Sequence, residues 1–463
     1  MGVTFDVLTK SSVDNERIEE NPVRILFVSL GCDKNLVDSE QMSGILAGQG
    51  FSFTDDEAEA DVVLINTCCF IGDAKQESID DIIYYGNLKE TGRLKGVIVC
   101  GCLAQRYAED IKKELPEVDA IVGTTAYDKI GDVIRQVIRG DRVCHLEDEN
   151  RFLYKPGNRQ LSGPGYSAYL KIAEGCDKRC TYCIIPKVRG QYRSFPLEEL
   201  VAEARSLADK GVSELCLVAQ EITVYGKDLY GKKSLPKLLA GLCEIEGIKW
   251  IRLLYCYPEE IDDDLIDMIR TQEKICNYID MPVQSGSDEV LRRMGRRCKR
   301  ADILDTVKKL KKAVPDICLR TTLISGFPGE SEEDHKMSLE LLREADFDRV
   351  GVFAYSPEEG TPAYEMDGQI SDEIKENRRD ELMAFQQSLR FENDEKLIGR
   401  LMDVLVEGRD VESGVYVGRT YRDAPDVDGL IFFESQNDYM SGAFVRVRIT
   451  GTNDYDLMGE EVS

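Results

Sequence analysis

The chain has 463 residues, with 59 lysines and arginines against 86 aspartates and glutamates, and a formal net charge of −27. At roughly 150 residues per domain, this length predicts about three domains. The acidic balance argues against broad nucleic-acid binding, which needs a basic face to neutralise phosphate, and it permits a strongly basic partner. The sequence has neither an apolar run of the ~20 residues that span a membrane nor a signal-peptide core near its start. We therefore expect a cytoplasmic protein with no membrane partner.

The N-terminal third alternates between predicted strands and predicted helices. Residues 1–22 are polar and lack periodicity, which predicts a disordered tail. Residues 23–148 predict a first domain, in which stretches of helical polarity separate short apolar, β-branched runs. These runs lie at residues 24–30, 61–67, 96–101 and 119–124. Such alternation predicts a parallel sheet with helices on both faces.

A second series of the same kind follows a linker rich in proline and glycine over residues 149–167. Residues 168–395 contain six apolar runs, which begin near residues 168, 214, 250, 278, 318 and 349. Their spacing suits one strand and one helix each, so we predict six βα units. The periodicity does not choose between an open doubly wound sheet and an incomplete barrel. A stretch rich in Glu, Arg and Lys over residues 371–397 predicts a long helix at the end of this domain.

The last part of the chain, residues 396–463, has a different character. Short alternating strands with turn residues between them predict a small antiparallel β-barrel. The chain as a whole is therefore predicted to be an α/β multidomain protein, with a parallel α/β domain, a central βα domain and a C-terminal barrel.

Fifteen cysteines and only two histidines favour metal or redox chemistry, because a reducing compartment disfavours disulfides. The strongest local signal is the segment GCDKRCTYC, directly after the first strand of the second series. It contains Cys176, Cys180 and Cys183, which we call the loop trio. Three thiolates so close together suit a soft metal centre, and they leave one iron of a [4Fe–4S] cluster without a protein ligand. Zinc, which would need a fourth ligand nearby, and unligated loop cysteines are the alternatives.

A second set of cysteines is dispersed but regular. Cys32, Cys68 and Cys102, which we call the strand-end trio, each follow one of the first three apolar runs. Neighbouring parallel strands lie ~5 Å apart and end at the same edge of a sheet, so their loops can converge on one centre. The alternative is that these cysteines are small buried hydrophobic side chains. Three independent placements at strand ends favour a second metal cluster.

The two trios, in this order, resemble a known family. The Cys-x3-Cys-x2-Cys spacing after the first strand of a βα series resembles the radical S-adenosylmethionine enzymes. The segments SLGCDKNLVDSE, NTCCF, GCLAQRY and GFPGE extend the resemblance to the radical S-adenosylmethionine methylthiotransferases. The resemblance runs from about Arg24 to the C-terminus. It implies a partial (β/α)6 radical-SAM barrel in the centre and a TRAM domain as the C-terminal barrel.

The resemblance also implies two [4Fe–4S] clusters and S-adenosylmethionine as cofactors. The cluster of the loop trio would bind S-adenosylmethionine and cleave it to a 5′-deoxyadenosyl radical, after one electron from a reductant such as flavodoxin or ferredoxin. The auxiliary cluster of the strand-end trio would carry the sulfur, and a second S-adenosylmethionine would supply the methyl group. Further candidates to line the cofactor and substrate pocket, each with turn or strand-end packing as the alternative, are Tyr182, Gln220, Gln284, Gly326, Phe327 and Pro328.

Two branches of the family differ in substrate. MiaB-like enzymes methylthiolate an adenosine in transfer RNA, and RimO-like enzymes methylthiolate the β-carbon of an aspartate in ribosomal protein S12. Residues 396–463 contain seven Lys and Arg against thirteen Asp and Glu, a net charge of −6. An RNA-binding barrel of this charge would repel phosphate, whereas a basic ribosomal protein would be attracted.

Sequence details also separate the branches. Lys34, and the segments GRTYRDAPDVDG and ITGTNDYDLMGE, resemble the RimO-like branch. Ser285 in PVQSGSD stands where that branch usually carries histidine, and it resembles the transfer-RNA enzymes instead. We therefore expect ribosomal protein S12 as the partner and no dedicated nucleic-acid grip. The alternatives are a transfer-RNA adenosine methylthiotransferase and, from another class, a non-catalytic iron–sulfur scaffold that binds ribosomes.

Overall fold

The computed structural model describes residues 22–154, 157 and 159–462. Residues 1–21 of the predicted tail and three residues of the predicted linker lie outside this range. The chain divides into two compact units. The first unit contains the described residues up to Gly163 together with Glu174–Lys178 and Cys183–Glu203. The second unit contains Pro164–Ala173, Arg179–Tyr182 and the described residues from Ala204 onward.

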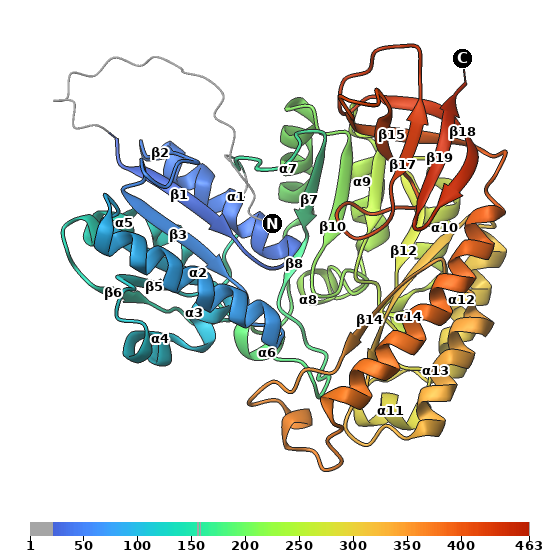
Figure 1. Ribbon diagram of the computed structural model, residues 1–463, viewed down its shortest axis with the longest axis horizontal. Coiled ribbons are helices and arrows are strands. Elements are labelled where there is room, and N and C mark those ends of the chain that lie inside the picture. The colour runs from blue at the N-terminus through green and yellow to red at the C-terminus, as the bar shows by residue number, and fades with distance from the viewer. Residues whose placement is uncertain (1–21, 155–156, 158, 463) are drawn as a thin grey trace. The chain divides into compact units, whose positions relative to one another are not determined.

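The first unit is built on a six-stranded parallel sheet in the order β2-β1-β3-β4-β5-β6 (Figure 1). The four predicted apolar runs form β1, β3, β4 and β5, which confirms the predicted parallel α/β domain. The two outer strands have only two and three residues, too few for a periodic signal. The strands are β1 (Arg24–Ser29), β2 (Ser52–Phe53), β3 (Val62–Thr67), β4 (Gly96–Gly101), β5 (Ala120–Val122) and β6 (Val143–His145).

Both faces of this sheet are covered by helices. Along β1, Leu26 and Val28 belong to the hydrophobic core on the side of α2, α3 and α4. The alternate residues Ile25 and Phe27 belong to the core on the side of α1 and α5. Because successive side chains of a strand point to opposite faces, strands buried on both sides become continuously apolar. The helices are α1 (Asp33–Gly48), α2 (Gly72–Thr91), α3 (Cys102–Arg106), α4 (Ala108–Glu114) and α5 (Ile130–Ile138).

The second unit contains a six-stranded parallel sheet in the order β14-β13-β12-β11-β10-β7. Each strand lies beside the next one in the sequence, without the reversal of order that a doubly wound sheet has. This order is the winding of a (β/α) barrel, and two free edge strands make the barrel incomplete. The strands are β7 (Ser167–Lys171), β10 (Glu214–Val218), β11 (Trp250–Leu253), β12 (Ile275–Asp280), β13 (Cys318–Ser325) and β14 (Arg349–Ala354).

Helices separate these strands along the chain, as predicted, and the long helix predicted near residues 371–397 is α14. Two short strands, β8 (Ala173–Glu174) and β9 (Arg193–Ser194), pair with each other beside the cysteine loop. None of the helices among the described residues has the length and apolar content needed to cross a membrane. The helices are α6 (Ile185–Val188), α7 (Leu197–Asp209), α8 (Lys227–Tyr230), α9 (Leu235–Cys243), α10 (Asp263–Thr271), α11 (Asp288–Arg293), α12 (Arg300–Ala313), α13 (Glu332–Ala345) and α14 (Asp372–Glu395).

The C-terminal residues form a closed five-stranded barrel in the order β15-β16-β17-β19-β18. All neighbouring pairs are antiparallel except β17 and β19, which run parallel. Alternate residues such as Val404, Val406 and Val447 point into a core that also holds Tyr416 and Phe433. The predicted small barrel is confirmed. Its strands are β15 (Leu401–Arg409), β16 (Tyr416–Thr420), β17 (Ile431–Glu434), β18 (Phe444–Asn453) and β19 (Asp456–Glu461).

The end of β16 and the connection from it to β17 attach this barrel to the second sheet. Arg419 forms an ion pair with Glu214, the first residue of β10. Asp423 accepts two hydrogen bonds from Arg349, the first residue of β14. Asp428 accepts a hydrogen bond of 2.7 Å from the hydroxyl of Tyr278 on β12. The barrel is thus bound to the amino edge of the sheet, opposite to the carboxyl edge from which the predicted pocket residues extend.

Candidate active site

The strand-end trio lies at the carboxyl edge of the first sheet. β3 lies between β1 and β4, and the register pairs Thr67 with Gly101, so β3 and β4 end level. Cys68 follows β3 directly and Cys102 begins α3, while Cys32 precedes the first residue of α1. The structure therefore brings the three loops that carry this trio to neighbouring positions on one sheet edge.

Two glycines allow the loops to approach each other closely. Gly31 has φ of +88°, and a Cβ there would lie 2.7 Å from the Cβ of Cys68. Gly101 has φ of +89°, and a Cβ there would lie 2.7 Å from the carbonyl oxygen of Thr67. Only glycine adopts this backbone conformation at low cost and leaves the space that these contacts need. Each of these glycines immediately precedes a cysteine of the trio, which is a signal that the sequence analysis did not use.

Asn35, in the first turn of α1, connects all three loops. Its Nδ2 donates hydrogen bonds of 3.0 Å to the carbonyl oxygens of Leu30 and Thr67. Its Oδ1 accepts from Nη2 of Arg189 and lies 3.8 Å from Sγ of Cys102. The side chain is fully buried, so these bonds hold the loops in place without competition from water. Sequence reasoning missed both Asn35 and Arg189.

Two thiols of the strand-end trio, those of Cys68 and Cys102, are shifted in their ionisation. Burial, together with the neighbouring thiols of Cys102 and Cys32, raises the pKa of Cys68 to about 12. Burial also raises the pKa of Cys102, while Arg189, whose Nε lies 3.3 Å from Sγ of Cys102, lowers it. Protons on such thiols are released when a metal binds the thiolates.

The donor set fits a polynuclear cluster. All cysteines of the chain are free thiols, so the trio is available for ligation. Within residues 22–154, 157 and 159–462, no three His, Cys, Asp or Glu side chains converge on a single metal ion. A [4Fe–4S] cluster places its cysteine ligands on different irons and does not need such convergence.

The loop trio follows β7 and β8 along the chain. Cys176 and Cys180 are buried and Cys183 is half-buried. The N–H of Cys176 donates to the carbonyl oxygen of Gly190 at 3.0 Å. On the other side of the loop, the N–H of Thr181 donates to the carbonyl oxygen of Met294 at 2.9 Å. Each of these bonds lies within one unit and holds its own part of a segment that is neither helix nor strand.

Among the predicted pocket residues, Tyr182 and Phe327 contact each other. Their rings are 6.4 Å apart with an interplanar angle of 82°, an edge-to-face arrangement. Phe327 is fully buried and also packs against Tyr355, whereas Tyr182 is only half-buried. The ring of Phe327 thus supports the ring of Tyr182, which is the more accessible of the two to a ligand.

The turn that contains Gly326 and Pro328 is held from outside. The N–H of Gly326 donates to the carboxylate of Glu330, and this carboxylate forms an ion pair of 2.9 Å with Arg378 of α14. The carbonyl oxygen of Pro328 accepts from Nε of Arg293 at 2.9 Å. The turn after β13 therefore has a defined conformation before any ligand binds.

Gln220 and Gln284 follow β10 and β12, also at the carboxyl edge of the second sheet. Gln284 has φ of +73°, which costs a non-glycine residue about 1–2 kcal/mol. Its backbone bonds to Thr322 and Ile324, and its buried Oε1 has no hydrogen-bond partner among the described residues. Such a strained residue with an unsatisfied acceptor is typical of a ligand site. The neighbouring Ser285 is 2% exposed and accepts from the N–H of the following serine, so its hydroxyl stabilises a turn.

Arg296 is the residue of this site that sequence reasoning missed. It is 7% exposed, and its guanidinium lies 4.2 Å from the ring centre of Tyr257, whose hydroxyl is 4.0 Å from Sγ of Cys180. Nη2 donates to the carbonyl oxygen of Pro282, but Nε and Nη1 have no hydrogen-bond partner among the described residues. The thiol of Cys298 is nearby, and burial raises its pKa to about 11 although Arg296 opposes this shift. A buried cation with two unsatisfied nitrogens beside Tyr257, which itself lies near Cys180, fits an anionic ligand.

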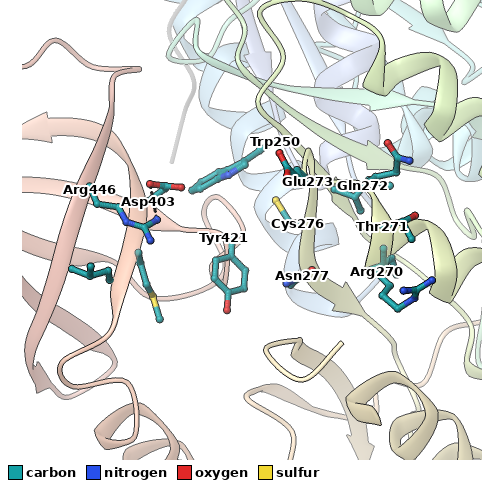
Figure 2. A pocket seen from close by; sticks show the side chains of 14 residues that line it. Trp250, Arg270, Thr271, Gln272, Glu273, Cys276, Asn277, Asp403, Tyr421 and Arg446 are labelled. Carbon is teal, nitrogen blue, oxygen red and sulfur yellow. Dashed lines mark hydrogen bonds and ion pairs between the residues drawn. The ribbon is translucent and has the colours of Figure 1, made fainter. Parts of the chain in front are cut away.

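A cavity of about 370 Å³ lies elsewhere, between the start of β12 and the C-terminal barrel. Side chains from the barrel, among them Asp403 and Arg446, lie across from Arg270 and Asn277 (Figure 2). Trp250, the first residue of β11, also lines it. Because Trp250 and Ile275 begin β11 and β12, the cavity lies at the amino edge of the second sheet and is separate from the carboxyl-edge residues described above.

An incomplete βα barrel with a Cys-x3-Cys-x2-Cys loop after its first strand defines a radical S-adenosylmethionine enzyme. Family models agree: the Radical SAM superfamily matches residues 170–351, the uncharacterized protein family UPF0004 matches residues 24–123, and the TRAM domain matches residues 398–462. The chain is 54% identical over 437 residues to the ribosomal protein uS12 methylthiotransferase RimO of Lachnoclostridium phytofermentans, covering 94% of this chain and 99% of that protein. The chain belongs to the family of ribosomal protein uS12 methylthiotransferases.

Two further relatives agree with this assignment, and one solved structure shares the fold. Proteins of the same name from Clostridioides difficile and Geobacter sulfurreducens are 47% and 48% identical, each over 95% of this chain and 98% or more of their own length. The radical S-adenosylmethionine methyltransferase TsrM from Kitasatospora setae, solved with cobalamin and a [4Fe–4S] cluster, has a TM-score of 0.53 and 14% identity. That match covers 83% of this chain and 81% of that chain. At this identity it shows a shared fold only.

Proposed function

We propose that the chain transfers a methylthio group to the β-carbon of an aspartate in ribosomal protein uS12, and that it does so with two [4Fe–4S] clusters and S-adenosylmethionine. The observation that carries this proposal is the 54% identity, over 94% of this chain, to a protein named as a ribosomal protein uS12 methylthiotransferase. Both cysteine trios are present in the same chain, which supports a radical mechanism with separate sites for radical formation and sulfur delivery.

The loop trio would hold the cluster that binds S-adenosylmethionine. When bound, the cluster and S-adenosylmethionine together would supply a carbon radical after one-electron reduction of the cluster. A flavodoxin or ferredoxin would be a suitable electron donor. Arg296 would bind a carboxylate beside Cys180, because two of its guanidinium nitrogens are unsatisfied. Gln284 would accept a hydrogen bond from a ligand amine or hydroxyl through its unpartnered Oε1. Tyr182, Gln220 and the turn at Gly326–Pro328 would complete the pocket.

The strand-end trio would hold the auxiliary cluster. Asn35 keeps its three loops together, and Arg189 donates to Sγ of Cys102. Gly31 and Gly101 leave the space that the approach of the loops requires. Cys69, the neighbour of Cys68, is 0% exposed, whereas Cys68 and Cys102 are 6% and 8% exposed. The latter two are therefore the better candidate ligands.

The charges of the C-terminal barrel support a protein substrate over RNA. Each arginine of residues 396–463 forms an ion pair with a carboxylate. Cations that are already neutralised contribute little to phosphate binding, which dominates RNA affinity. The net charge of −6 would instead attract a basic ribosomal protein. The arginines, with their partners, are Arg400 with Asp316, Arg409 with Asp438, Arg419 with Glu214, Arg422 with Asp348, Arg446 with Asp403 and Arg448 with Glu460.

The test is anaerobic reconstitution of the full chain with iron and sulfide, followed by incubation with S-adenosylmethionine, dithionite and one of two substrates. With ribosomal subunits that contain uS12, we expect 5′-deoxyadenosine and a methylthio-aspartate, found by mass spectrometry of uS12. With unmodified transfer RNA we expect no methylthio-adenosine. Modification of transfer RNA alone would refute the substrate assignment, and absence of 5′-deoxyadenosine would favour a non-catalytic scaffold.

A further inference from the structure

Arg189 lies six residues after Cys183 in the sequence, yet its side chain is buried beside the strand-end trio. The short helix α6 comes between the two residues. Ile184 and Val188 belong to the same hydrophobic core as β1, β3 and β4, and the carbonyl oxygen of Val188 accepts from Oγ1 of Thr124 at 3.0 Å. The chain that leaves the loop trio is therefore part of the first unit.

The guanidinium of Arg189 is 2% exposed, and all three of its nitrogens have partners. Nε donates to Sγ of Cys102 at 3.3 Å. Nη1 donates to Asp38 at 2.6 Å and to Glu174 at 3.0 Å, and Nη2 donates to Oδ1 of Asn35. One cation therefore holds a cysteine sulfur together with two carboxylates in a site from which water is excluded.

The same short segment also contacts the loop trio. Glu174, a partner of Arg189, stands two residues before Cys176. The carbonyl oxygen of Gly190 accepts the N–H of Cys176 at 3.0 Å. Arg189 and Gly190 thus bind one cysteine of each trio, the first through a side chain and the second through the backbone.

The charges around Cys102 depend on this arginine. With Arg189 present, its positive charge partly offsets the carboxylates of Asp38 and Glu174, which are both buried. Without it, two buried negative charges would stand beside a sulfur that ligates a cluster, at high cost in a region of low dielectric constant. Hydrogen bonds and positive charge at ligand sulfurs make a cluster easier to reduce.

We propose that Arg189 is a positioning residue that fixes the Cys102 ligand and raises the reduction potential of the auxiliary cluster. The proposal rests on the two-cluster function proposed above. Arg189 acts through Cys102 and not on the substrate. The couple concerned is the one-electron reduction of the cluster, in which dithionite donates the electron.

The experiment uses the full chain with Cys176, Cys180 and Cys183 changed to alanine, so that only the auxiliary cluster is assembled. Iron content and an EPR-monitored titration with dithionite are measured after anaerobic reconstitution. We expect about four irons per chain. If this parent protein binds no cluster, the two-cluster function is refuted, and the proposal on Arg189 with it.

Three variants in this background test Arg189 itself. R189M, neutral and of similar size, should shift the reduction equilibrium at least tenfold toward the oxidised form, which is about 59 mV for one electron. D38N removes a negative charge from the same guanidinium and should shift the equilibrium in the opposite direction. R189K keeps the positive charge, so its reduction potential should lie closer to that of the parent protein than to that of R189M.

Opposite shifts separate an electrostatic role from a structural one, because a structural role alone would lower iron content in both R189M and D38N. A potential that R189M leaves unchanged at full iron content would overturn the proposal. If R189M fails to hold a cluster, D38N decides: a shift toward the reduced form supports the proposal, and an unchanged potential refutes it.

Discussion

Changing Glu214 to glutamine is expected to destabilise the junction between the second sheet and the C-terminal barrel. Glu214 is fully buried, and its carboxylate accepts from Arg252 at 3.0 Å and from Arg419 at 2.7 Å. Burial disfavours the ionised carboxylate, but the two arginines more than compensate and hold its pKa at about 2, below the ordinary 4.5. The glutamine variant would lose this interaction, leaving buried Arg252 without its carboxylate and Arg419 with Glu407 alone.

The size of the effect follows from the pKa. A value of about 2 in place of 4.5 corresponds to about 3 kcal/mol of stabilisation at neutral pH, at ~1.36 kcal/mol per pH unit. Because the folded-state pKa is lowered, this stabilisation is fully present well above pH 4.5 and is lost as the pH falls toward 2. By pH 3.5, about 1.4 kcal/mol of it should be gone.

The assay is urea unfolding followed by the fluorescence of Trp250, the only tryptophan in the sequence. Its ring packs edge-to-face against Phe444 of the barrel at 4.8 Å, so its emission reports on this junction. Glu214→Gln should lower the free energy of unfolding at pH 7 by about 3 kcal/mol, and by less at pH 3.5. Asp438→Asn is the control, because Asp438 pairs with Arg409 at the surface and should contribute less than about 1 kcal/mol.

Two results would refute this reasoning. If the Glu214 variant unfolded at the same urea concentration as the unaltered protein at pH 7, the buried ion pairs would not stabilise the junction. If the difference between the two proteins were the same at pH 7 and pH 3.5, the stabilisation would not depend on the ionised carboxylate.

Three further predictions concern the proposed function. Arg296→Leu should weaken binding of S-adenosylmethionine or of a uS12 peptide by about 10- to 100-fold, because charged hydrogen bonds contribute ~1.5–3 kcal/mol. Arg296→Lys, which keeps the charge, should weaken binding less. If the unaltered protein and the two variants bound S-adenosylmethionine and the peptide with equal affinity, this prediction would be contradicted. Cys180→Ala should abolish formation of 5′-deoxyadenosine, whereas Cys68→Ala should leave this cleavage intact and abolish methylthio transfer. Equal loss of cleavage in both variants would show that the two trios do not have separate roles in radical formation and sulfur delivery. Added salt should slow modification of uS12 several-fold by screening the acidic barrel, and a rate independent of salt would exclude electrostatic steering.

The sequence alone determined the order of the domains and the position of both cysteine trios. The strands of the first sheet were predictable because they are buried on both faces and so become continuous apolar runs, as in Val62–Thr67 and Gly96–Gly101. The cysteines were conspicuous because they follow such runs directly, and the ends of parallel strands meet at one edge. These are patterns among neighbouring residues, so they can be recognised in the sequence without knowledge of tertiary contacts.

Only the tertiary structure decided which polar residues serve these sites. Arg189 lies 87 residues from Cys102 in the sequence, and Arg419 lies 205 residues from Glu214. Arg296 stands among charged residues that resemble a solvated surface, yet it is buried beside Tyr257. The sequence also left open whether six βα units form a doubly wound sheet or a barrel, which the unreversed strand order settled. Each of these features depends on contacts between residues that are distant in the sequence. A buried charge is stable only where folding brings a partner to it, so the local periodicity of the sequence does not predict which charged residues are buried.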